Sequence, residues 1–207
     1  VYATSIGPFA GYRGQGARAL SIGISAGYRD QGTYAVAIGP YTGGYGQGSQ
    51  ATAVGYNAGH YGQSLSAVAI GYKAGRGIIE FATYVSGGVG STTLVVDDTS
   101  GIVAGMELIN SIAYTSGQTV VSVDSGTSLT ISAVADGTPS SSIIQFSSSG
   151  QGLSAVAIGG QAGEQNQGAS AVAIGAGAGN LNQAANSIVI NATGSTVQNT
   201  QASSLVI

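Results

Sequence analysis

Few residues of this chain carry side chains suited to acid–base or nucleophilic chemistry. His60 is the one histidine and there is no cysteine, which excludes a thiolate nucleophile, a thiolate metal site and a disulfide framework. A serine nucleophile would depend on His60 as its base, and we expect no serine in the strand–turn–helix context of a nucleophile elbow. We interpret His60 as a loop residue, in preference to a catalytic base or a ligand.

Carboxylates offer a second kind of chemistry, because glycan cleavage uses a pair of them about 5–9.5 Å apart. Glu80, Glu107 and several aspartates between residues 77 and 149 are the main supply. Asp97 and Asp98 are adjacent and would suit Ca²⁺, although such a pair more often marks a solvated turn. The sequence therefore predicts no catalytic residue, no metal site and no cofactor. A glycan depolymerase is the alternative from the enzyme class.

Tyrosines supply the clearest surface signal. Nine of the 11 lie in residues 1–76, and several are spaced 16 residues apart, which predicts columns of rings, some beside Arg13 and Arg29. Exposed columns of this kind either stack sugar rings or stabilise neighbouring turns of the chain. The candidate ligand contacts are Tyr12, Tyr28, Tyr45, Tyr56, Tyr61 and Tyr72.

A repeat of 16 residues explains that spacing. The stretch "SAVAIGYKAG" at residues 66–75 has close copies along the chain. Its isoleucine position recurs at Ile6, Ile22, Ile38, Val54, Ile70, Ile158, Ile174 and Ile190. From Ile70 to Ile158, and likewise from Gln63 to Gln151, the step is 88 residues, which is 72 more than one period. Two independent markers thus predict a domain inserted into one turn of a periodic array.

Each copy predicts one coil of a parallel β-solenoid, with about eight coils in the chain. "AVAI" alternates a small with a large apolar residue, as a strand does, and the glycines that follow permit tight turns. We expect the large residues to fill the interior and the alanines to form an exposed column. Close packing between identical chains would use that column, whose members are Ala37, Ala53, Ala69, Ala157 and Ala173.

The distribution of charge marks two domain boundaries. Only 6% of residues are charged, and all five lysines and arginines precede residue 77. In residues 77–149, by contrast, every charged residue is acidic. We therefore predict coils at 1–76, an inserted domain at 77–149, and further coils with a closing segment at 150–207. The net charge of −3 argues against nucleic-acid binding, and no apolar run approaches the length of a membrane-spanning helix. Because the chain starts at Val1, we expect a fragment or a processed product.

The inserted stretch is expected to contain five or six short strands, among them "TTLVVDD" and "SLTISAV", between glycine- and serine-rich turns. That pattern predicts a small all-β sandwich or barrel. Since the insertion is free of the packing constraint that repeats in every coil, we expect ligand recognition there first and at the tyrosine-rich coils second.

The pattern "AVAIGxxAGxxxQGxxAVAIG" resembles the head repeat of trimeric autotransporter adhesins (YadA-like), over residues 3–75 and 151–192. The resemblance implies a left-handed parallel β-roll wound as a homotrimer. The stretch "NSIVINATGSTVQNTQASSLVI" is similar to segments that close repeat arrays in fibre proteins of large DNA viruses and phages.

Together these resemblances imply a non-enzymatic structural segment of a virion fibre on an extracellular surface. Such a segment would attach to a host surface receptor or glycan, without inserting into a membrane. The head of a bacterial adhesin on the outer-membrane surface is one alternative, and a spacer without any ligand is another.

Overall fold

The computed structural model describes residues 2–86, 91–104, 106–110, 118–132, 143–148 and 150–207. The chain divides into two compact units, one formed by Val1–Ile78 with Ser149–Ile207 and the other by Ile79–Ser148. Every regular element in the described ranges is a β-strand, so the predicted all-β class is confirmed. None of the described residues belongs to a helix long and apolar enough to cross a membrane.

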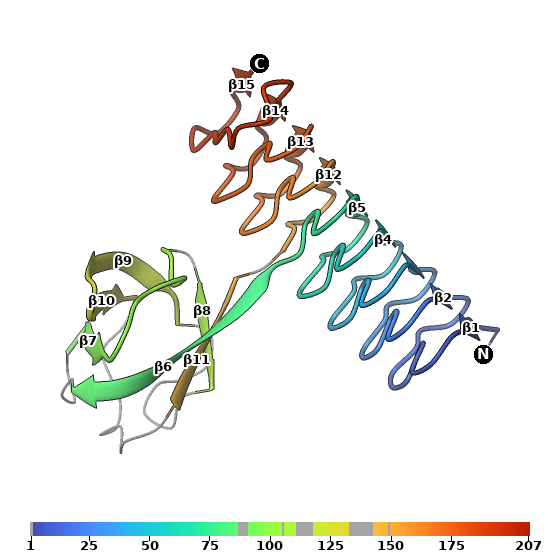
Figure 1. The fold of residues 1–207 in the computed structure, drawn as a ribbon, viewed down its shortest axis with the longest axis horizontal. Helices are drawn as coiled ribbons and strands as arrows, with labels where there is room; N and C mark the ends of the chain where they lie inside the picture. Colours follow the sequence, from blue (N-terminus) through green and yellow to red (C-terminus); the bar gives the residue numbers. More distant parts are fainter. Residues whose placement is uncertain (1, 87–90, 105, 111–117, 133–142, 149) are drawn as a thin grey trace. The chain divides into compact units, whose positions relative to one another are not determined.

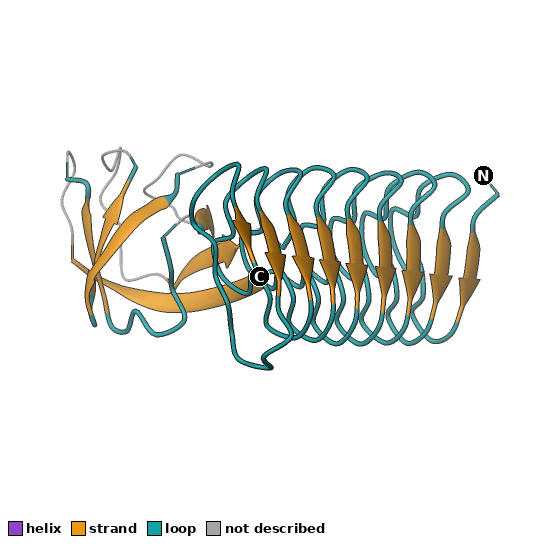
Figure 2. Cartoon of the chain, turned by 90° about the horizontal axis from the view of Figure 1, so that it is seen from above, coloured by secondary structure: helices purple, strands orange, loops and turns teal. Residues whose placement is uncertain are grey.

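The first unit is a parallel β-solenoid, as predicted (Figure 1). Nine short strands stack in one sheet in the order β1-β2-β3-β4-β5-β12-β13-β14-β15. Their bounds are β1 Thr4–Ile6, β2 Leu20–Ile22, β3 Val36–Ile38, β4 Thr52–Val54, β5 Val68–Ile70, β12 Val156–Ile158, β13 Val172–Ile174, β14 Ile188–Ile190 and β15 Leu205–Val206. The strands lie side by side along one face of the stack, and turns complete each coil (Figure 2).

Strand pairing keeps the 16-residue register throughout the solenoid. Ala37 in β3 pairs with Ala53 in β4, so equivalent residues of successive coils lie directly above one another. β5 then pairs with β12 and places Ala69 opposite Ala157, which means that the stack of coils continues across the inserted residues. The insertion therefore leaves the periodic array intact.

Small side chains fill the interior of the solenoid, which corrects one of the predictions. The alanines expected to form an exposed column for chain–chain contact are instead fully buried inside their own chain, namely Ala37, Ala53, Ala69, Ala157 and Ala173. The coil is too narrow for more, because a Cβ added to Gly43 would lie only 3.2 Å from the Ala37 methyl. The larger strand residues must therefore point outward.

Valine and isoleucine accordingly form the outer face of the sheet. In β3, β5, β12 and β13 they flank a buried alanine, and Ile70, Ile158, Ile174 and Ile190 remain 38% to 41% exposed. The predicted alternation of large and small residues is right, but the inside and the outside are exchanged. One face of the solenoid is thus a continuous apolar surface.

One glutamine from each coil shares the interior with the alanines. Its Nε2 donates to the Oε1 of the next glutamine at 3.0–3.1 Å and to a strand carbonyl of its own coil. This glutamine ladder consists of Gln31, Gln47, Gln63, Gln151, Gln167 and Gln183. Because both atoms of each bridging amide are hydrogen-bonded, these polar groups are buried without a large desolvation penalty.

Glycine at the turn after each strand from β1 to β5, and after β12 and β13, permits the close stacking. Gly39 has a φ of 124°, and a Cβ there would lie 2.7 Å from the carbonyl oxygen of Gly55 in the next coil. No side chain fits such an approach, and the conformation itself favours glycine. The requirement explains why the isoleucine of the repeat is followed by glycine.

The second unit is a six-stranded sheet in the order β8-β11-β6-β7-β10-β9, and its described strand pairs are antiparallel. The strands are β6 Ile78–Ser86, β7 Thr93–Val96, β8 Glu107–Asn110, β9 Val120–Ser125, β10 Ser128–Ile131 and β11 Ile143–Ser148. The two ends of this order meet, because Glu107 bridges to Thr119 and the Leu108 amide donates to the Gln118 carbonyl at 2.8 Å. This closure favours the barrel over the sandwich.

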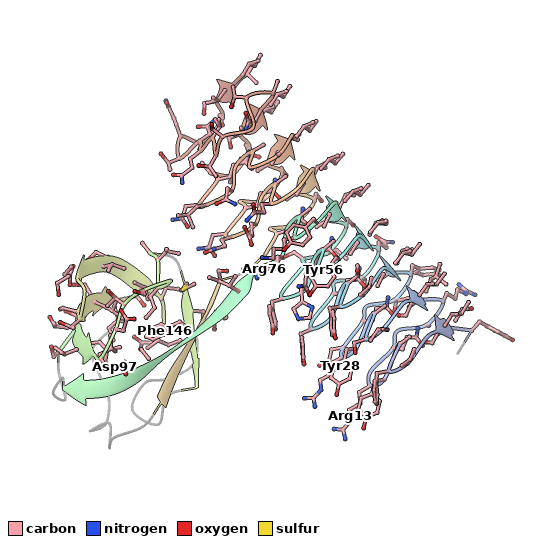
Figure 3. All side chains as sticks on the ribbon, in the orientation of Figure 1. Arg13, Tyr28, Tyr56, Arg76, Asp97 and Phe146 are labelled. Atoms are coloured by element: carbon pink, nitrogen blue, oxygen red, sulfur yellow. The ribbon has the colours of Figure 1, made fainter. Side chains whose placement is uncertain are left out.

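Large apolar side chains fill the second unit. Phe146 is fully buried within it (Figure 3). The other fully or nearly fully buried large residues are Leu94, Met106, Leu108, Leu129 and Ile131. This is the ordinary core of a small globular domain, and it contrasts with the alanine and glutamine interior of the solenoid.

Candidate ligand-binding groove

Tyrosines one coil apart stack face to face on the first coils. The stacked pairs, with their ring-centroid separations, are Tyr12–Tyr28 (5.2 Å), Tyr45–Tyr61 (5.2 Å) and Tyr56–Tyr72 (5.7 Å). The interplanar angles are 9°, 15° and 13° in the same order. The 16-residue spacing thus produces ring columns, and their role as ligand contacts stays a prediction.

One column is interrupted, and a groove lies at the interruption. The position held by Tyr12 and Tyr28 in the first two coils is Gly44 in the third and His60 in the fourth. The His60 ring lies over Gly44, since a Cβ there would be 2.4 Å from the His60 Nδ1 atom. A groove of about 440 Å³ is lined by Phe9, Ser25, Tyr28, Tyr41, Tyr45 and His60.

Edge-to-face contacts between the aromatic rings fix the side chains that line this groove. The Tyr45 ring lies 5.7 Å from the Tyr28 ring at 66° and 5.5 Å from the His60 ring at 90°. The Tyr41 ring lies 6.4 Å from the His60 ring at 83°. Such perpendicular pairs are a favoured arrangement of aromatic rings. The groove is therefore built before any ligand arrives.

His60 is held in one orientation in the wall. Its Nδ1 bonds to the carbonyl oxygen of Tyr41, which can only accept, so Nδ1 carries the proton. Burial is the largest cause that lowers the pKa of His60; the Tyr41 hydrogen bond opposes it and the Arg76 charge adds to it. The ring is neutral at pH 7, which leaves Nε2 as a hydrogen-bond acceptor.

Two arginines lie beside the groove on adjacent coils. Arg13 and Arg29 pair as neighbours in a β-bridge, and each guanidinium lies 5.5 Å from the ring of the tyrosine that precedes it. Figure 3 shows Arg13 and Tyr28 on the side of the coils opposite the strands. Both arginines are exposed, and neither forms an ion pair within the described residues. By contrast, Arg76 pairs with Glu164 at 3.0 Å.

The groove contains a serine whose sequence context we did not single out. Gly23-Ile24-Ser25-Ala26-Gly27 has the spacing of a hydrolase nucleophile elbow, and Ser25 has a φ of 53°. However, Phe9 and Tyr41 at the same position of neighbouring coils share that conformation, with a φ of 56° each. The His60 Nδ1 bonds to Tyr41, and no Ser25–His60 hydrogen bond occurs among the described residues. The strained turn belongs to the repeat.

Carboxylates of the second unit accept hydrogen bonds from residues close to them in sequence. The Asp97 side chain accepts from the Asp98 amide at 2.9 Å, and Asp98 accepts from the Ser100 amide at 2.9 Å, as in a solvated turn. Hydrogen bonds from Ser122 and then Thr130 lower the pKa of the exposed Asp124. No cluster suited to a metal ion occurs among the described residues. The Glu80 side chain and the whole of Asp136 lie outside the described part of the structure.

Asn191 begins a match to the N-glycosylation sequence, Asn191-Ala192-Thr193. Its side chain is buried, and its Nδ2 donates to the carbonyls of Ala176, at 2.6 Å, and Ser195. The same side chain accepts from the Thr193 amide at 2.9 Å. Asn191 therefore serves to close the last coils, and its amide nitrogen is not presented for modification.

The structure brings some of the predicted contacts together and separates others. Tyr28 and Tyr45 line the groove, and Tyr12 and Tyr61 stack on them from the flanking coils. Tyr56 and Tyr72 form a stacked pair that does not line it. The wall also contains Phe9, Ser25, Tyr41 and His60, which were not predicted as ligand contacts. Their signal was the break in the tyrosine column at Gly44.

No protein-family model matches the chain, and neither the curated proteins nor the solved structures contain a match to it.

Proposed function

We propose that the chain is a structural segment of a homotrimeric surface fibre that attaches to a host receptor or glycan. The observation that carries the proposal is the exposed valine and isoleucine face of the solenoid. The last residue of each three-residue strand is a valine or isoleucine, and the side chains of Ile70, Ile158, Ile174 and Ile190 are more than one-third exposed. Apolar surface in such a continuous strip is typical of a protein interface.

An identical chain is the partner that fits this face. The outward side chains recur once per coil in register, so their spacing along the rod is the spacing of neighbouring strands, about 4.8 Å. A second solenoid of the same sequence presents the same spacing over the whole length. Burying the strip would contribute about 25 cal/mol for each Å² of apolar surface removed from water. That contribution matters because the interior of the coils consists mainly of alanines and one glutamine per coil.

The number of chains and the biological setting rest on the resemblance of the repeat. YadA-like heads imply three chains and a left-handed wind, and the closing segment favours a virion fibre on an extracellular surface. A bacterial trimeric autotransporter adhesin head is the alternative setting. A depolymerase gains no specific support, because the Asp97 and Asp98 carboxylates accept hydrogen bonds from backbone amides of their own turn.

The test is the mass in solution of two variants that each place one charge on the surface. Ile70→Glu puts a carboxylate on the apolar face, and we expect it to reduce the trimer to monomer. Leu65→Glu is the matched control, since Leu65 is equally an exposed aliphatic residue but lies outside the strands. Light scattering measures both, with circular dichroism to verify the fold. A trimeric Ile70→Glu variant would contradict the proposed interface.

A further inference from the structure

The groove on the first coils combines aromatic rings and hydroxyl groups with two nearby arginines. Its walls are aromatic rings, and Tyr41 and Tyr45 remain exposed to solvent. The hydroxyl groups of Ser25, Tyr28, Tyr41 and Tyr45 make no hydrogen bond with the described residues. Aromatic faces bordered by free hydroxyls match the alternating C–H faces and hydroxyl edges of a pyranose ring.

Arg13 and Arg29 favour a ligand that carries a negative charge. Arg29 follows the wall residue Tyr28 in sequence, and it pairs with the wall residue Tyr45 in the next coil. Arg13 lies one coil away in the same column. Two guanidinium groups without a carboxylate partner among the described residues offer donors in the planar arrangement that suits a carboxylate.

We propose that this groove binds an acidic saccharide, a pyranose whose ring lies against the tyrosines and whose carboxylate is held by Arg13 and Arg29. The volume of about 440 Å³ lies in the usual range of small-ligand sites, and it suits one or two sugar units. The inference deepens the attachment function and rests on it for the assembly of three copies. Three grooves on one fibre would raise a weak affinity by avidity.

The groove is also free when the proposed interface forms. The apolar face consists of strand side chains, whereas Arg13 and Tyr28 lie on the opposite side of the coils (Figure 3). Assembly through the strands would therefore leave each groove exposed on the outside of the fibre. This position is the one required for contact with a polysaccharide on a cell surface.

The experiment uses two sugars that differ only at C6, methyl β-glucuronide and methyl β-glucoside, titrated into the intact chain and followed by saturation-transfer NMR. We expect the glucuronide to bind with a dissociation constant below about 10 mM and at least tenfold more tightly than the glucoside, as the loss of one charge-assisted contact implies. Light scattering on the same sample reports the trimer separately. A trimer that binds neither sugar would overturn this inference alone.

Paired variants test the residues. Arg13→Gln with Arg29→Gln should weaken glucuronide binding at least about tenfold and leave glucoside binding unchanged. The matched control is Arg18→Gln with Lys73→Gln. Arg18 and Lys73 also lie over tyrosine rings, at 5.4 and 5.1 Å, but these rings belong to Tyr34 and Tyr72, which do not line the groove. It should change glucuronide binding less than about twofold, by the small contribution of remote charges. Equal weakening by both doubles would overturn the assignment.

A third variant tests the aromatic wall. Tyr41→Ala removes an exposed ring from the groove and should abolish binding of both sugars, while circular dichroism reports an unchanged fold. Undiminished glucuronide binding to Tyr41→Ala would contradict the groove. Adenosine monophosphate provides the test of another ligand class, and its binding as tightly as the glucuronide would overturn the assignment to a saccharide.

Discussion

The two units of this chain bury different kinds of side chain. The barrel places Leu94, Met106 and Phe146 inside and leaves polar residues on its turns. The solenoid places alanine and glutamine inside and leaves valine and isoleucine on its outer face. A closed sheet has a wide interior, whereas a coil of 16 residues encloses little more than alanine methyl groups and one extended amide.

The width of the enclosed space decides which residues are interior. In the barrel, hydrophobicity and burial coincide, so stability comes from apolar burial. In the solenoid, hydrogen bonds between the coils and the glutamine ladder hold the stack, and the apolar side chains remain available to a partner. The barrel encloses its own apolar core, whereas the solenoid exposes an apolar face that we propose as an interface between chains.

The largest expected effect comes from breaking the glutamine ladder. Gln63→Leu would leave one N–H of the Gln47 Nε2 and the Gln151 Oε1 without their partners, which lie at 3.1 and 3.0 Å. Each unpaired buried group costs about 1–3 kcal/mol, so we expect the free energy of unfolding of the solenoid to fall by about 2–6 kcal/mol. Urea unfolding measures it. Gln50→Leu, at an exposed position, is the control, and an equal loss there would refute the role of the ladder.

A cavity in the barrel should come next. Phe146→Ala removes a fully buried ring and should lower the free energy of unfolding of the barrel by about 3–5 kcal/mol. Hydrogen exchange should show faster exchange of the amides of β9 and β10 and no change in β4 and β5. Val121→Ala, at an exposed position of β9, should have little effect. Equal loss of protection in both units would mean that they unfold together.

Overpacking the coil should have a smaller effect. Ala69→Leu forces three carbon atoms into an interior with no room for them, and we expect a loss of about 1–3 kcal/mol from the free energy of unfolding. Ile70→Leu, one residue along on the outer face, keeps its volume and should cost less. Thermal unfolding compares the two. A more stable Ala69→Leu variant would show that the interior is wider than described.

The smallest expected effect is a dependence of stability on pH through His60. Its pKa is lowered in the folded chain, so the unfolded state takes up the proton first as the pH falls below about 6.5. Its contribution to stability is therefore complete above that pH and is lost as the pH falls through the folded pKa. Urea midpoints from pH 7 to 5 would measure it, with His60→Gln as the control. An identical profile for the variant would exclude His60 as the cause.

The sequence predicted the periodic part of the fold well, because its evidence was spacing. The step between Gln63 and Gln151 predicted the continuity that β5 and β12 show. What it did not predict was the facing of the strands, since hydrophobicity places isoleucine inside and glutamine outside. The coil is too narrow for isoleucine side chains, so they lie outside and alanine and glutamine lie inside. The width of the coil depends on the folded turns and cannot be predicted from hydrophobicity.

The groove was predictable in part for the same reason. The 16-residue spacing identified Tyr28 and Tyr45, and the columns formed by their rings. Phe9, Ser25 and Tyr41 are also spaced by 16, but their contribution depends on a turn with positive φ that brings them beside His60. Neither that conformation nor the ring that lies over Gly44 follows from residue spacing.

The mass of the unmodified chain in solution shows whether the solenoid assembles through its apolar face. Because the solenoid exposes its large apolar residues to water, we expect the chain to oligomerise. A solenoid with its apolar residues inside would be stable as a monomer. Multi-angle light scattering at micromolar concentration should give about three times the 20.1 kDa of one chain. A stable, folded species of 20.1 kDa across that concentration range would contradict the account.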